Sequence, residues 1–133
     1  MRSSTLGVIC LLIVSLGCGS GNNALAPHFQ PEVGNVTDSF QFQTTGITDI
    51  TQTLQYTWRN TGTQANVDQA CAISAGTGTL TIRDALNVAV YSNDLRTNGS
   101  AMASLPGATG NWTIQVNMNR VSGTLNFRVQ KRP

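Results

Sequence analysis

The chain has 133 residues, only 11% of them charged, and its eight basic and six acidic residues give a formal net charge of +2. The basic residues are scattered along the chain, so the sequence lacks the clustered positive charge of a nucleic-acid-binding protein. The length is sufficient for one domain with a sizeable core, but not for two.

The first element in chain order is an apolar run over residues 6–16, interrupted only by Gly7 and Ser15. A membrane-spanning helix needs roughly 20 apolar residues, about twice this length. The run therefore predicts a signal peptide over residues 1–17. Its end, the sequence SLGC at residues 15–18, resembles the lipobox of bacterial lipoprotein precursors.

That resemblance implies that Cys18 is acylated and becomes the first residue of the mature protein, anchored to a membrane of the cell envelope. Gly19 stands where inner-membrane lipoproteins of enteric bacteria carry aspartate, which favours the outer membrane. The alternative is an ordinary secretory signal peptide cleaved between residues 17 and 20.

Residues 18–39 are rich in Gly, Asn and Pro and show no apolar period, so we expect a flexible tether. The segment contains His28, the single histidine of the chain, and Phe29.

From Phe40 onward, apolar and polar residues alternate; for example, Leu54, Tyr56 and Trp58 are separated by polar residues. Alternation of period two predicts strands with one buried face. Glycine and asparagine between the runs mark turns. The expected strands, about seven in number, lie near residues 40–45, 52–60, 65–73, 78–83, 88–92, 111–118 and 123–130.

The domain over residues 40–133 is therefore predicted to be all-β, an antiparallel β-sandwich of two sheets packed face to face. Trp58, Trp112 and Phe127 fall on the buried side of their strands. Cys71 is the one cysteine after Cys18, so no disulfide can form within the domain. Its position in the alternation of the segment 65–73 predicts a buried side chain.

Three stretches resemble small β-sandwich domains of secreted bacterial proteins, including the bacterial pre-peptidase C-terminal domain. They are GTLTIRDALNVAVY at residues 78–91, GNWTIQV at 110–116 and VSGTLNFRV at 121–129. Members of that family are typically non-catalytic appendages of secreted enzymes. The resemblance thus implies a non-catalytic module.

No nucleophile, base and acid are grouped in the sequence, and no nucleophile-elbow, phosphate-loop or zinc-protease motif occurs. We therefore expect no enzyme activity and no cofactor. Calcium is the one metal to consider, since Asp84 with Asn87, and Asn93 with Asp94, offer oxygen ligands in turns. Capping of the turns by these side chains is the favoured explanation.

Together these features predict a lipid-anchored, non-catalytic envelope protein that contacts another envelope or secreted protein through a strand edge or end loops. The candidate loops are residues 106–111 and the end near Gly76. The alternative is a carbohydrate-binding accessory module. Against this alternative, most aromatic residues fall on the buried side of their strands, which leaves only Tyr91 and Phe29 to contact a sugar at the surface.

Overall fold

The computed structural model describes residues 30–133, which form seven β-strands and no helix. All the strand pairs are antiparallel, so the predicted all-β antiparallel fold of about seven strands is confirmed. The strands are β1 (Glu32–Val36), β2 (Ser39–Asn60), β3 (Ala65–Gln69), β4 (Ala72–Arg83), β5 (Ala89–Asp94), β6 (Gly99–Ala103) and β7 (Gly110–Lys131).

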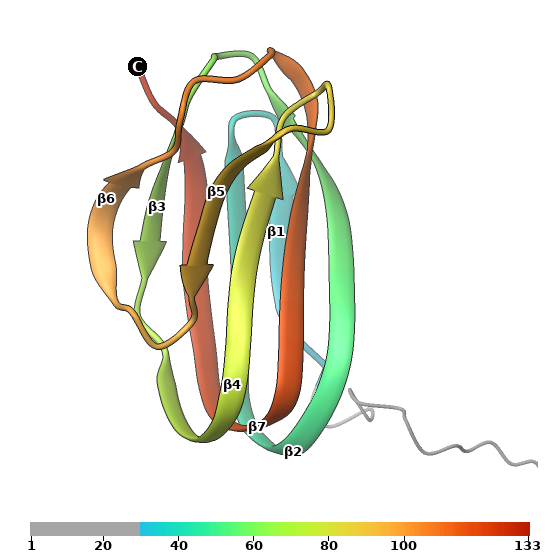
Figure 1. Ribbon diagram of the computed structural model, residues 1–133, viewed down its shortest axis with the longest axis vertical. Coiled ribbons are helices and arrows are strands. Elements are labelled where there is room, and N and C mark those ends of the chain that lie inside the picture. Colours follow the sequence, from blue (N-terminus) through green and yellow to red (C-terminus); the bar gives the residue numbers. More distant parts are fainter. Residues whose placement is uncertain (1–29) are drawn as a thin grey trace, which may run out of the picture.

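The strands form one continuous sheet instead of the two separate sheets that we expected. Strand β7 pairs with β2 along its whole length, and its other edge pairs with β4 over residues 113–124 and with β3 over residues 127–131. The short strands β1, β6 and β5 extend the sheet from β2, β3 and β4. Strands β2, β4 and β7 all bend at the same level, so the sheet curls over on itself (Figure 1).

We call the two halves of this curled sheet its arms. The first arm contains β1, β3, β6, residues 39–44 of β2 and residues 124–131 of β7; the second contains residues 77–83 of β4, β5, residues 52–60 of β2 and residues 110–118 of β7. The arms face each other, because the rings of Phe40 and Tyr56, from opposite halves of β2, have centroids 5.4 Å apart.

Glycines make the bends possible. Gly76 in β4 has φ 82° and Gly123 in β7 has φ 128°, a region that other residues rarely adopt. A Cβ atom at either position would collide with a backbone carbonyl, of Arg120 or of Ala72 respectively. The sequence predicted turns that end strands at both places. In the structure the strands continue through them with shifts of register.

The concave side of the curled sheet holds the core. The prediction of which side of each strand is buried is confirmed for the large aromatic residues. Trp58 and Trp112 are fully buried and meet edge to face, with centroids 5.9 Å apart. Phe127 stacks on Phe42 at 5.0 Å. Cys71 is buried, as expected, and is a free thiol.

Several strand boundaries differ from the prediction. Strand β1 lies inside the segment expected to be a tether up to residue 39, and β6 was not predicted at all. The expected strands at 40–45 and 52–60 are one strand, as are those at 111–118 and 123–130, whereas the segment 65–73 is divided between β3 and β4. The signal peptide, Cys18 and His28 lie outside the described residues.

Candidate functional site

Four connecting loops meet at one end of the molecule, which we call the loop end; it is uppermost in Figure 1. The bends of β2, β4 and β7 lie at the opposite end. The loops join β1 to β2, β2 to β3, β4 to β5 and β6 to β7, at residues 37–38, 61–64, 84–88 and 104–109. Strand β7 also finishes there, close to the end of the chain.

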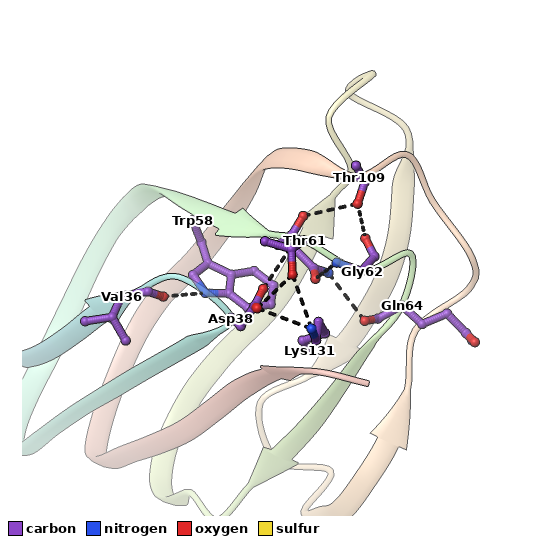
Figure 2. A network of polar contacts seen from close by, with 9 residues as sticks. Val36, Asp38, Trp58, Thr61, Gly62, Gln64, Thr109 and Lys131 are labelled. Atoms are coloured by element: carbon purple, nitrogen blue, oxygen red, sulfur yellow. Dashed lines mark hydrogen bonds and ion pairs between the residues drawn. The ribbon is translucent and has the colours of Figure 1, made fainter. Parts of the chain in front are cut away.

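Asp38 connects the first two loops to the end of β7 (Figure 2). Its carboxylate accepts hydrogen bonds from the backbone N–H and the hydroxyl of Thr61, both at 2.8 Å, and lies 3.4 Å from the Lys131 ammonium. The Thr61 N–H bond, above all, lowers the pKa of Asp38. Nearby, the Trp58 indole donates to the carbonyl of Val36 at 3.1 Å.

The loop before β7 is fastened to the loop after β2. The Thr109 hydroxyl donates to the carbonyl of Gly62 at 2.7 Å, which Figure 2 also shows. The Gly107 N–H donates to the Thr63 carbonyl at 2.7 Å, and the Gln64 amide donates to the Ser104 carbonyl at 2.8 Å. These bonds join loops that are about 40 residues apart in sequence.

Asp84 holds the remaining loop. One carboxylate oxygen accepts the N–H groups of Leu86 and Val88, both at 2.9 Å, and the other accepts that of Ala108 at 2.8 Å. The Ala108 bond is the largest cause of the lowered pKa of Asp84. Asn87 takes the left-handed conformation, with φ 65°. A charged acceptor of three backbone N–H groups thus fixes two loops at once.

This arrangement bears on the four calcium candidates. Both oxygens of Asp84 already bind backbone N–H groups, so Asp84 caps its turn. Asn93 and Asp94 lie at the other end of the β4–β5 pair, where Asp94 is opposite Thr79. The structure therefore divides the candidates between two places, and residues 30–133 contain no group of three potential metal-ligating side chains among His, Cys, Asp and Glu.

The loops at residues 84–88 and 104–109 display three large aliphatic side chains on this fixed backbone. Leu86 is 74% exposed, Leu105 65% and Val88 56%. The carbonyl of Val90, which is buried, accepts the Leu105 N–H at 2.8 Å, so the loop before β7 lies against the start of β5.

Residues 106–111 were predicted to be a candidate binding loop, but the exposure of these three side chains was not predicted. The exposure of the two leucines could have been predicted, because Leu86 lies inside the turn sequence Asp-Ala-Leu-Asn and Leu105 directly precedes Pro-Gly. A leucine among turn-forming residues has no strand face on which to be buried.

The other candidates for chemistry or display are placed differently. Burial raises the pKa of the Cys71 thiol. Tyr91, considered for display, is half-buried, and its hydroxyl donates to the side-chain carbonyl of Gln69. Residues 30–133 contain no helix that could span a membrane.

Comparisons with protein-family models, with curated proteins and with solved structures give no match for this chain. We therefore infer the function from the geometry of the described residues.

Proposed function

We propose that the protein is a non-catalytic, lipid-anchored protein of the bacterial cell envelope that binds another envelope or secreted protein through its loop end. The observation that carries the proposal is the exposure of Leu86, Val88 and Leu105 on loops held by hydrogen bonds. Exposed apolar side chains on a preorganised backbone lose little conformational entropy when a partner covers them.

The charges at this end indicate the chemistry of the partner. Arg59, Arg83 and Arg132 belong to the last residues of β2 and β4 and to the residue after β7. None of them forms an ion pair within residues 30–133, whereas Asp38 and Asp84 are already engaged. A partner surface with an apolar centre and an acidic rim is complementary, and binding should weaken as the salt concentration rises.

The direction of the chain supports this orientation. Strand β1 runs towards the loop end, so its first residue, Glu32, lies nearer to the bends (Figure 1). With Cys18 acylated, the loop end would be presented away from the anchor, where a second protein can reach it.

The test is copurification after chemical crosslinking of intact cells. We compare the wild type with Leu86→Ser/Leu105→Ser and with Val33→Ser, an exposed aliphatic residue of β1, as the matched control. The proposal requires a crosslinked protein that is retained by Val33→Ser and lost by the double variant. Equal retention by all three proteins would refute it.

A carbohydrate-binding role is a second candidate, because one specific surface favours it. The outer face of the first arm has two hollows lined mainly by polar side chains, remote from the loop-end leucines.

A further inference from the structure

The outer face of the first arm carries a regular array of polar side chains. Register places Gln41 beside Arg128 and Arg128 beside Asp68, across β2, β7 and β3. The rows on either side are Ser39, Gln130 and Asn66 towards the loop end, and Gln43, Asn126 and Ala70 towards the bends. Neighbouring strands lie about 4.8 Å apart, so these side chains lie next to one another on the outer face, and we call this array the platform.

Two adjoining hollows interrupt this platform. The first has a volume of about 240 Å³ and lies between β1 and the amides of Gln41, Gln43 and Asn126. The second, of about 290 Å³, lies over Ala70, Asp68 and Arg128. Gln41 and Asn126 line both hollows, so the two lie next to each other. They exist because Gly34 and Ala70 are the small residues of the face.

The amides of the platform are available for a ligand. Gln41, Gln43 and Asn126 are exposed, and their side chains form no hydrogen bond with residues 30–133. The neighbouring pair is fixed, because the Asp68 carboxylate accepts the Ala101 N–H at 2.7 Å and lies 3.1 Å from the Arg128 guanidinium. The positions of the donors and acceptors around the hollows are therefore partly set in advance.

The charge of the face points to an uncharged ligand. Arg128 and Asp68 neutralise each other, and the single further charge along the hollows is Glu32 at the rim. Each amide offers two donors and a carbonyl acceptor, which suits hydroxyl groups that both donate and accept. The outer face of the second arm differs, because Thr53 and Asn117 there bind each other and its hollow measures only about 150 Å³.

We infer that the platform around Gln41 and Asn126 binds a neutral oligosaccharide. Its hydroxyl groups would bond to the amides and to the Arg128–Asp68 pair, with one sugar unit over each hollow. Since no aromatic ring lies on this face of the array, the affinity comes from hydrogen bonds without stacking and is weak. The inference does not depend on the loop-end proposal, because the two surfaces share no residue.

The test is an NMR titration of the ¹⁵N-labelled full chain with four neutral tetrasaccharides: chitotetraose, cellotetraose, maltotetraose and xylotetraose. We expect at least one of them to shift the side-chain amide signals of Gln41, Gln43 and Asn126 in a saturable manner. Signals of Leu86 and Leu105 should not move, which separates this site from the loop end.

Two variants and one matched control make the test sharp. Gly34→Tyr fills the first hollow, and it should fold normally because a Cβ there meets nothing closer than 3.8 Å and the backbone is not left-handed. Gln41→Ala removes one amide and should weaken binding about five- to tenfold. Gln55→Ala, an exposed glutamine on the second arm, should bind like the wild type.

Three results would overturn the inference: no saturable shift with any of the four sugars, shifts centred on the second arm, or full binding by folded Gly34→Tyr. Loss of binding in Gly34→Tyr and Gln41→Ala, with binding retained in Gln55→Ala, would support it. Either result leaves the loop-end proposal to its own crosslinking test.

Discussion

Replacing Trp112 by phenylalanine should both destabilise the protein and loosen the loop end. The Trp112 indole N–H donates to the Ala108 carbonyl at 2.7 Å, and the ring is fully buried beneath that loop. Phenylalanine has no donor and a smaller ring. Its introduction therefore leaves a void and a carbonyl that has lost its shortest hydrogen bond.

The size of the effect follows from these two losses. A void of about 40 Å³ costs about 1 kcal/mol at roughly 24 cal/mol per Å³. A lost hydrogen bond costs about 1 kcal/mol more. The free energy of unfolding should thus fall by about 2 kcal/mol, which for a domain of this size lowers Tm by about 8 to 16 °C.

Trp58→Phe is the matched control, since Trp58 is equally buried and donates to the Val36 carbonyl at 3.1 Å. Urea unfolding, followed by the fluorescence of the remaining tryptophan, gives the free energy in each variant. Hydrogen exchange gives the location. Trp112→Phe should accelerate exchange in residues 84–88 and 104–109, and Trp58→Phe near the β1–β2 turn.

An unfolding free energy of Trp112→Phe within about 0.5 kcal/mol of the wild type would refute this reasoning, because substitutions without structural consequence fall in that range. Identical exchange patterns in the two variants would also refute it.

Four further predictions concern other parts of the chain. Gly123→Ala should cost at least about 2 kcal/mol in urea unfolding, because φ is 128° and a Cβ would strike the Ala72 carbonyl; a smaller cost would contradict the proposed cause of the bend. Hydrogen bonds, that of the Ala108 N–H first, lower the pKa of Asp84 below 3.8, so its stabilisation is present above pH 3.8 and is lost as the pH falls through the lower folded value. Asp84→Asn should flatten the pH dependence of unfolding in that window, and an unchanged slope would be evidence against the role of Asp84. Because burial raises the pKa of the Cys71 thiol above 9.0, the stability that this group provides should decline as the pH rises beyond about 9, and at pH 8 an alkylating reagent should label Cys71 no faster than the protein unfolds; labelling at the rate of a free thiol would contradict this. Cys18→Ser should release the protein from membranes, whereas unchanged membrane fractionation would argue against acylation.

The buried face of each long strand could be predicted because alternation is a local property. Trp58, Trp112 and Phe127 each follow the period of their own strand, and the core lies where that period places it. Strand β1 gave no such signal, because Glu32–Val36 is an edge strand whose residues are all exposed.

The bends of β4 and β7 could not be predicted from neighbouring residues alone. Gly76 and Gly123 were interpreted as residues of turns that separate two strands. Whether a strand continues past a glycine depends on its pairing partners, and here β4 stays paired with β7 on both sides of Gly76. That pairing is long-range and cannot be predicted from a short window of sequence.

The candidate site was predictable only in part, for the same reason. The turn-forming role of Asp84 follows from its neighbours, but its bond to Ala108, 24 residues away, depends on the curled sheet. The exposure of Leu105 likewise results from the docking of its loop against Val90. Each turn can be predicted from the residues next to it, whereas the convergence of the turns at one end depends on the fold.

The most direct test of the loop end as the contact surface is site-specific photocrosslinking in intact cells that produce the protein. A photoreactive amino acid is placed at Leu86 or Leu105, and at Gln55 and Gln115 on the outer face of the second arm as controls. Our account predicts one discrete crosslinked product from positions 86 and 105 and none from 55 and 115. Crosslinking of equal intensity at all four positions, or only at the two controls, would contradict it.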